Sequence, residues 1–305
     1  MILKNTKILL FWLLSCSYLM AQNPKEDLKL KAKIEEILKG FKGDVGVYVR
    51  NLKTNKFVAI SADTVFPTAS IVKIPIQIGI FDKLQKGVWK YSDDIMFRDS
   101  IRYDEGIVGS LKDSTKLPLS YVVMLMLTVS DNTGSLWLQS MAGGGKRINE
   151  LLDEYGFENT KVNSRTKGRE SFQKKYGWGQ TTPKEITELL IKIREGKIIS
   201  PDASDRMYRN LGRQAWDGEG LSQIPENIKV MSKNGAVNRS RSEVCLIHAP
   251  HGEYAYALIT KNQQDETWAR NNEGYVLLRK LSALLYNYFE PKSRWKPVLD
   301  YEKWW

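Results

Sequence analysis

The sequence predicts an α+β protein: a five-stranded antiparallel sheet, flanked by helices from the two ends of the chain, carries an inserted all-helical lobe. Alternating apolar residues, typical of strands, fall near the two ends of the chain, at residues 44–52, 56–63, 229–237, 243–250 and 254–262. From about Phe66 to Met207 the apolar residues recur with helical spacing instead. Strand groups separated by a long helical block predict one sheet assembled from both ends of the chain.

Helical patterns also flank the strands, over residues 26–41 and 273–289. We expect residues 22–305 to form one domain with a sheet lobe (about 26–63 and 215–289), a helical lobe (about 64–214) and a tryptophan-rich tail (290–305). The tail should pack back on the body, because exposing its aromatic residues would be unfavourable. A groove between the sheet edge and the helical lobe is the expected place for a site.

The N-terminus has the layout of an export signal. Two lysines precede a short apolar run at residues 8–14, and Ala21 supplies a small residue before the expected cleavage point. This pattern predicts a signal peptide over residues 1–21 and an exported protein, periplasmic or secreted. The alternative is lipid attachment at Cys16.

The overall composition limits the possible partners. The chain has 305 residues and a net charge of +11. Its hydrophobic content of 42% is too high for a disordered chain. No apolar run reaches the ~18 residues that a membrane-spanning helix needs. No zinc-finger, helix-turn-helix or RNA-binding spacing is present, so nucleic acid is not the expected partner. The excess positive charge fits either a basic face for anionic ligands or diffuse solvated charge. We expect the protein to be a monomer.

Histidine and cysteine usage narrows the chemistry. Only two histidines occur, His248 and His251, and neither lies near a serine motif, which argues against a Ser-His-Asp triad. No cluster of His, Cys and Asp has metal-ligand spacing, so the sequence predicts neither a metal nor a cofactor. Cys245 would be alone after signal removal, and its strand-like surroundings indicate a packing role.

A lysine interrupts the apolar segment of residues 66–81, three positions after Ser70. A helix that starts near Ser70 would place Ser70 and Lys73 on one face, and Pro75 is tolerated only in the first turn of such a helix. Burial and the positive end of the helix both disfavour the ammonium form of Lys73. A neutral lysine can take the proton of a serine hydroxyl, and the N–H at the helix start can face an oxyanion.

Two further motifs give this pair its meaning. Ser130, Asp131 and Asn132 lie between two apolar helical runs, and Lys233, Asn234 and Gly235 lie in a strand pattern. Each motif has a structural alternative, a helix cap and a strand end, respectively. In this order the three motifs resemble those of the class A serine β-lactamases and penicillin-binding proteins. The similarity covers about residues 28–288, including "GVYVRNLKTNKFVAISADTVFPTASIVK" and "PLSYVVMLMLTVSDNTGSLWL".

The resemblance implies a β-lactamase/transpeptidase-like fold and a set of acylation roles. Ser70 would be the nucleophile that forms an acyl-enzyme, and Lys73 would activate it. Ser130 would pass a proton to the leaving nitrogen. The backbone N–H groups of Ser70 and Ala236 would form the oxyanion hole. A small-molecule β-lactam or a D-alanyl peptide would be the substrate.

The resemblance also implies residues that bind substrate. Asn132 would bind the side-chain amide, and Lys233 would hold Ser130 and the substrate carboxylate. Arg241 would support that carboxylate, with Arg239 as a competitor because the spacing is about one residue short. Asn234 departs from the hydroxyl residue that the family has at this position, although its amide can also donate.

The second departure concerns the loop from Gly156 to Pro183. In class A enzymes this loop carries the glutamate that positions the deacylating water, and counting back from Pro183 places Thr166 there. The nearest carboxylate is Glu170, which we name as the candidate base; a solvent-facing role is its alternative. Three hypotheses follow: a β-lactamase, a D-alanyl-D-alanine peptidase similar to penicillin-binding proteins, and a non-catalytic covalent sensor.

Overall fold

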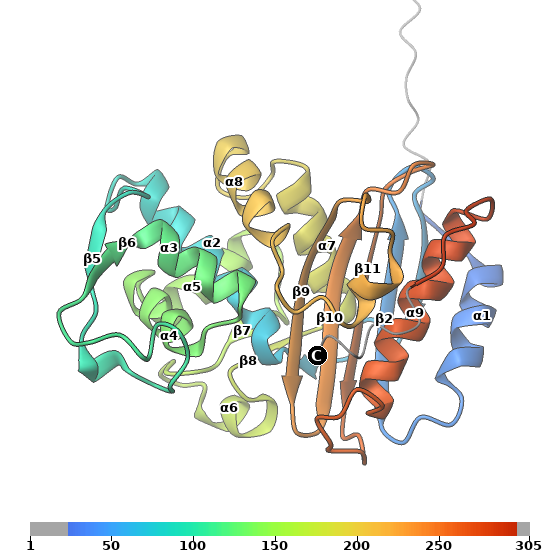
Figure 1. Cartoon of the computed structure of the whole chain (residues 1–305), viewed down its shortest axis with the longest axis horizontal. Helices are drawn as coiled ribbons and strands as arrows, with labels where there is room; N and C mark the ends of the chain where they lie inside the picture. Colours follow the sequence, from blue (N-terminus) through green and yellow to red (C-terminus); the bar gives the residue numbers. More distant parts are fainter. Residues whose placement is uncertain (1–23, 298–305) are drawn as a thin grey trace, which may run out of the picture.

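The computed structural model describes residues 24–297. Its helices are α1 (Leu28–Leu38), α2 (Lys73–Gln85), α3 (Leu119–Thr128), α4 (Asn132–Met141), α5 (Gly144–Glu154), α6 (Glu170–Tyr176), α7 (Pro183–Arg194), α8 (Pro201–Leu211) and α9 (Glu273–Phe289). Three short 3-10 helices are η1 (Ala69–Val72), η2 (Asp99–Ile101) and η3 (Gly220–Gln223). The fold is the predicted α+β fold, with a helical lobe beside a sheet lobe (Figure 1).

The main sheet contains six strands, one more than predicted. They are β1 (Lys25–Glu26), β3 (Lys56–Ile60), β2 (Asp44–Asn51), β11 (Tyr254–Lys261), β10 (Ser240–Ile247) and β9 (Val230–Val237), in this order across the sheet. The five long strands pair antiparallel, as predicted, whereas β1 pairs parallel with β3. A two-residue strand carries no periodic pattern, so the sequence could not reveal β1.

The inserted lobe is not entirely helical. Short strands β4 (Phe66–Pro67), β8 (Gly179–Thr181) and β7 (Lys161–Val162) form one small sheet, and β5 (Asp94–Met96) pairs with β6 (Lys116–Pro118). These strands have two or three residues and no readable alternation, which explains why the sequence pattern missed them. The small sheet β4–β8–β7 ties both ends of the loop of residues 163–178 to the segment that precedes Ser70.

Both faces of the main sheet are buried, and strand β10 shows this within four residues. Val244 and Leu246 pack into the core shared with the helical lobe, whereas Cys245 and Ile247 pack into the core under α1 and α9. Cys245 is a buried free cysteine, in agreement with the predicted packing role. Figure 1 shows α1 and α9 on the opposite side of the sheet from the helical lobe.

The 3-10 turn η1, which precedes α2, lies against the edge strand β9, and this contact places the first motif beside the third. A Cβ at Gly235 would lie 2.7 Å from Thr68 O and 2.9 Å from Ser70 N. Only glycine lets the two backbones approach so closely. The sheet edge and the helical lobe therefore meet at Ser70, as expected.

The expected signal peptide, its Cys16 alternative and the aromatic residues Tyr301, Trp304 and Trp305 lie outside the described residues. Trp295, at the start of the tail, packs edge-on against Tyr286 of α9, with ring centroids 6.1 Å apart. Within residues 24–297 there is no helix with the length and apolar content needed to cross a membrane.

Candidate active site

Ser70 and Lys73 lie at the junction of η1 and α2, on the same face. Ser70 sits in the 3-10 turn, and Lys73 begins the α-helix. The Lys73 Nζ lies 3.0 Å from the Ser70 Oγ. Pro75 is the third residue of α2, where its missing N–H has no helical partner in any case. The expected pairing of serine and lysine is therefore present.

The Lys73 Nζ has three further oxygen contacts, at 2.6 Å to Ser130 O, 2.9 Å to Ser130 Oγ and 2.8 Å to Asn132 Oδ1. The carbonyl oxygens of Ser130 and Asn132 can only accept hydrogen bonds, whereas the two hydroxyls can also donate. A neutral amine can therefore give its two hydrogens to the carbonyl oxygens and direct its lone pair at a hydroxyl. This geometry suits proton removal from Ser70.

The environment of Lys73 favours that neutral form. Its side chain is fully buried, and burial lowers the pKa of Lys73 to about 7, while the charges of Asp131 and Asp104 act in the opposite direction. Roughly half of the amine is then neutral near pH 7. The sequence argument from burial is supported by the structure, and the two opposing carboxylates are an addition to it.

The second motif forms a tight turn that hydrogen bonds of the Asp131 side chain hold in place. Ser130 has a φ of +63°, a conformation that non-glycine residues seldom adopt. Asp131 caps α4 by accepting from Gly134 N at 2.7 Å, and it also accepts from Val108 N at 2.9 Å. These bonds hold the Ser130 hydroxyl and carbonyl toward Lys73.

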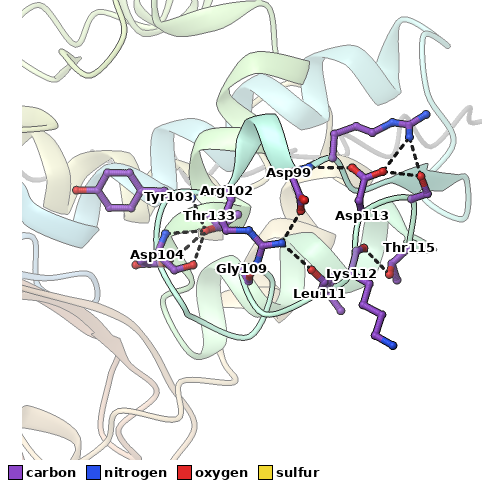
Figure 2. A network of polar contacts seen from close by, with 12 residues as sticks. Asp99, Arg102, Tyr103, Asp104, Gly109, Leu111, Lys112, Asp113, Thr115 and Thr133 are labelled. Carbon is purple, nitrogen blue, oxygen red and sulfur yellow. Dashed lines mark hydrogen bonds and ion pairs between the residues drawn. The ribbon is translucent and has the colours of Figure 1, made fainter.

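The orientation of Asn132 is set by a loop that sequence reasoning did not single out. Asp104 accepts a hydrogen bond from Asn132 Nδ2 at 2.8 Å, which leaves Oδ1 facing Lys73. Figure 2 shows Tyr103 N and Asp104 N donating to Thr133 Oγ1, at 3.1 Å and 3.3 Å. Arg102 closes the same loop through the carbonyls of Gly109 and Leu111. Only a three-dimensional contact reveals the role of Asp104.

Lys233 and Asn234 bring the third motif to the same place. Lys233 is fully buried on β9, and burial, followed by the charge of Lys73, lowers the pKa of Lys233 well below its ordinary value. Its Nζ donates to Asn234 O at 2.9 Å and to Asn234 Oδ1 at 3.0 Å. Among the described residues its hydrogen-bond partners are thus both on Asn234, and Ser130 is not one of them.

Two cavities meet at Ser70 and together form one cleft. The first, here called the α6-side cavity, has a volume of about 580 Å³ and is lined by residues that include Tyr103, Lys175, Trp178, Arg239 and Lys261. The second, the Trp216-side cavity, has a volume of about 850 Å³ and includes Trp216, Asn234, Trp268, Arg270 and Tyr275. Ser70, Asn132 and Ala236 line both cavities.

A sequence model of the beta-lactamase enzyme family matches residues 29–289, most of the chain. The chain belongs to this family. It is 22% identical to beta-lactamase VEB-1 of Pseudomonas aeruginosa over 301 residues, 94% of this chain and 99% of that protein.

Solved structures show the same fold. PBP-A is 24% identical and superposes with a TM-score of 0.78, covering 88% of this chain and 99% of its own. A single-site mutant of PBP-A, an acyl-enzyme complex with penicillin G, has 24% identity and a TM-score of 0.77 over 88% of this chain and 98% of its own. A class A beta-lactamase from Mycobacterium abscessus is 20% identical, with a TM-score of 0.76 over 85% and 99%.

In this β-lactamase-family protein the structure does not bring Glu170 to Ser70. Glu170 is exposed in the first turn of α6, and one carboxylate oxygen accepts from Gly168 N at 3.0 Å. Hydrogen bonds from the backbone N–H groups of Glu170 and Gly168 lower the pKa of this carboxyl. Glu170 lines neither cavity, so its placement matches the solvent-facing alternative rather than a base beside the nucleophile.

Thr166 does not replace the missing carboxylate. Its hydroxyl donates to Ser164 O at 2.9 Å, and its side chain packs against Gly145 of α5. Nearby, Arg169 donates to Asn163 Oδ1 and Gln180 Oε1, both at 2.7 Å. The loop is therefore held by amide and guanidinium groups.

Arg241 differs from its expected place. It is fully buried, and its guanidinium donates to Thr267 O at 2.5 Å and to Ser240 O at 3.0 Å. The rings of Trp268 and Tyr275 lie 4.6 Å from it. Arg241 lines neither cavity, because backbone carbonyls hold its guanidinium against the rings of Trp268 and Tyr275, which themselves line the Trp216-side cavity.

Two other arginines line the cleft. Arg239, the competitor, lines the α6-side cavity. Arg270 lines the Trp216-side cavity together with Asn234, and its guanidinium donates to Gly218 O at 3.0 Å. Sequence reasoning missed Arg270, because its loop carries no motif. Because it lines the same cavity as Asn234, Arg270 is a candidate partner for a substrate carboxylate.

Proposed function

We propose that this protein opens β-lactam rings through an acyl-enzyme on Ser70. The observation that carries this proposal is the position of the Lys73 Nζ, 3.0 Å from Ser70 Oγ and 2.9 Å from Ser130 Oγ. One buried amine with a pKa of about 7 can thus receive a proton at the nucleophile and return it toward the leaving group.

Acylation then proceeds in a balanced sequence. Neutral Lys73 accepts the hydroxyl proton of Ser70, and Oγ attacks the carbonyl carbon of the ring amide. The N–H groups of Ser70 and Ala236 stabilise the oxyanion. As the C–N bond breaks, Ser130 gives its proton to the ring nitrogen and takes one from Lys73. The lysine ends as a neutral amine, and Ser70 carries the ester.

Substrate binding is assigned to the groups around this centre. The amide of Asn132 faces both cavities and would bind the side-chain amide of the substrate. Asn234 lines the Trp216-side cavity and would hold the ring carboxylate, and the buried Lys233, whose Nζ donates to Asn234, would support it from β9. Arg270 would add a second cation to that carboxylate, in place of the buried Arg241.

Hydrolysis of the ester is the slower step in this proposal. No carboxylate from the loop of residues 163–178 lines the described cleft. Lys73 is neutral again after acylation and is the remaining base that can take a proton from water. Without a dedicated carboxylate, we expect the acyl-enzyme to accumulate.

A second candidate is a D-alanyl-D-alanine peptidase, with a covalent sensor as its non-catalytic limit. Two observations favour it: the exposed position of Glu170 and the similarity to PBP-A, whose mutant forms an acyl-enzyme with penicillin G. The acylation chemistry would be the same, with a terminal D-alanine as the leaving group.

We also propose that the protein is exported and acts in the periplasm or outside the cell, because a signal-like segment precedes Gln22. Intact mass of the chain recovered from an expressing bacterium tests this. A chain that begins at Gln22 supports cleavage after Ala21. A lipid-modified chain that begins at Cys16 would contradict cleavage after Ala21 but not export, whereas an uncleaved chain would contradict both.

The functional test mixes residues 22–305 with a chromogenic cephalosporin and follows colour against enzyme equivalents, with intact mass at the end. Colour with an adduct that is lost in Ser70→Ala supports ring opening at Ser70. Slow colour beyond one equivalent supports a β-lactamase, whereas a stall at one equivalent supports the peptidase or sensor. The absence of both colour and adduct would refute the β-lactam assignment.

A further inference from the structure

Three cationic side chains from three separate segments line the α6-side cavity. Lys175 lies at the end of α6, Arg239 in the turn between β9 and β10, and Lys261 at the end of β11. Within the described part of the chain, the residues that line this cavity include no aspartate or glutamate. The proton relay of Lys73 does not use any of these three cations.

Two of the cations are held in place by the protein. Lys261 Nζ donates to Val65 O at 3.0 Å and lies 4.6 Å from the ring centre of Phe66. Arg239 donates to Gln263 O at 3.2 Å and to Asn262 O at 3.3 Å. Cations that are already positioned lose less conformational entropy when they bind an anion.

Neighbouring acids offset this charge only in part. Glu266 lies 3.6 Å from Arg239, and both side chains are about half exposed, where an ion pair is weak. Asp44, the strand partner of Lys261, accepts a hydrogen bond from Asn262 at 2.8 Å and does not itself line the cavity. Besides Lys175, the adjacent loop of residues 163–178 adds four basic residues and one acidic residue. The summed field at the cavity therefore favours an anion.

The remaining wall of the cavity is aromatic. Tyr103 and Trp178 meet edge to face, with ring centroids 5.0 Å apart, and Tyr176 lies beside Lys175. Tyr103 is 53% exposed, so much of its ring is available to a ligand. Aromatic surface next to fixed cations fits an organic group that carries a carboxylate.

We propose that the α6-side cavity selects substrates whose acyl group bears a carboxylate. This inference rests on the proposed acylation of Ser70, since Ser70 and Asn132 connect the cavity to the reacting bond. The two cavities then divide the substrate: the Trp216-side cavity takes the ring carboxylate near Arg270, and the α6-side cavity takes the acyl carboxylate. A substrate with carboxylates at both ends satisfies the cations of both.

Two matched pairs of penicillins test the proposal. Benzylpenicillin and α-carboxybenzylpenicillin differ by one carboxylate next to the side-chain amide. Hexanoyl and adipoyl derivatives of 6-aminopenicillanic acid differ by a terminal methyl against a terminal carboxylate. The readout is the second-order rate constant for growth of the Ser70 adduct, measured by intact mass. We expect the anionic member of at least one pair to react about 3- to 10-fold faster at low salt.

Salt and variants identify the cause. The ratio of the two rate constants should fall toward one at about 0.5 M salt, because screening weakens the attraction. In the double variant Lys175→Gln, Arg239→Gln the ratio should fall at least about twofold. Lys174→Gln is the control for the Lys175→Gln half of this variant, since it removes one positive charge from the same helix at a residue that does not line the cavity. It should keep most of the ratio.

The outcomes separate this inference from the proposed function. If no penicillin acylates Ser70, the proposed function fails and the inference fails with it. If all four acylate and both ratios are one or lower, only the charge selection is overturned. A ratio above one that the double variant leaves unchanged also overturns it, because the preference would then arise elsewhere.

Discussion

The cluster of Ser70, Lys73, Ser130 and Asn132 borders the same cleft as the loop of residues 163–178. The two regions differ in the burial of their charged groups. In the cluster, Lys73 is fully buried and its Nζ has four oxygen contacts of 3.0 Å or less. In the loop, the Glu170 carboxylate faces solvent and accepts a hydrogen bond from Gly168 N. Burial lowers the pKa of Lys73 so that it can accept a proton near pH 7. Glu170 is exposed, and hydrogen bonds from backbone N–H groups lower its pKa, which makes it a weaker base.

This contrast separates the two half-reactions. Every side chain that the proposed acylation uses lies within hydrogen-bonding reach of Lys73 Nζ. The backbone N–H of Ala236, a further group of this proposal, belongs to strand β9. The group that would activate water for the second half-reaction is not supplied by the loop. The proposed acylation centre thus lies next to a loop whose charged groups suit anion binding better than water activation.

The largest expected effect comes from removing the shared base. Lys73→Met should lower the acylation rate constant by about 10³-fold or more, because the Ser70 hydroxyl loses its proton acceptor. Thermal unfolding should show equal or higher stability, since Met replaces a buried polar group with an apolar chain of similar length. Lys83→Met, at the other end of α2, is the control. An acylation rate within tenfold of wild type would mean that another base serves Ser70.

A smaller effect should follow from pushing the two halves of the centre apart. Gly235→Ala places a methyl group 2.7 Å from Thr68 O and 2.9 Å from Ser70 N. We expect a loss of about 1–3 kcal/mol in the free energy of unfolding and roughly tenfold slower acylation. Urea unfolding and adduct growth measure the two effects. Unchanged acylation would show that the position of β9 against Ser70 is not critical.

The next change acts on the pH dependence. Acylation needs neutral Lys73, so its rate should rise with pH through a pKa of about 7. The charge of Asp104 raises the pKa of Lys73, so Asp104→Asn should move this rise to lower pH. Near pH 6 the acylation rate constant of the variant should stay within a few-fold of wild type. The larger fraction of neutral Lys73 raises this rate constant, whereas the weakened hydrogen bond to Asn132 lowers it. A shift to higher pH would contradict the assigned role of Asp104.

The smallest expected effect sharpens the other side of the contrast. Glu170→Gln should leave the decay rate of the acyl-enzyme within about twofold, because an exposed carboxylate that lines neither cavity does not activate the water that attacks the ester. Decay of the adduct after removal of free penicillin measures this rate. Slower decay by more than tenfold would place Glu170 in the reaction and would restore it as the base.

Much of the fold was readable from the sequence, because long strands and helices have clear apolar periods. The five long strands and the burial of Cys245 follow from alternation alone. Strand β1 and the two small sheets were missed, since two or three residues carry no period. Their strands are defined by pairing with distant segments, such as Phe66 with Thr181.

The site was predictable where residues act within one motif and not where they act across motifs. The three-residue spacing of Ser70 and Lys73 already fixes their shared face. Asp104 and Arg270 belong to loops without any motif, and only the folded chain brings them beside Asn132 and Asn234. Arg241 was misplaced because strand position gives the face of a residue but not the carbonyls that capture its guanidinium.

The most direct test of the contrast between the two regions is the fraction of acylated enzyme during turnover. Residues 22–305 are mixed with excess benzylpenicillin, quenched at intervals and weighed intact. Because the loop supplies no base for the water, most of the enzyme should carry one penicillin on Ser70 until the substrate is exhausted, and the adduct should then decay slowly. Turnover of many equivalents with little adduct at any time would contradict this expectation, because the loop side of the cleft would then supply efficient water activation.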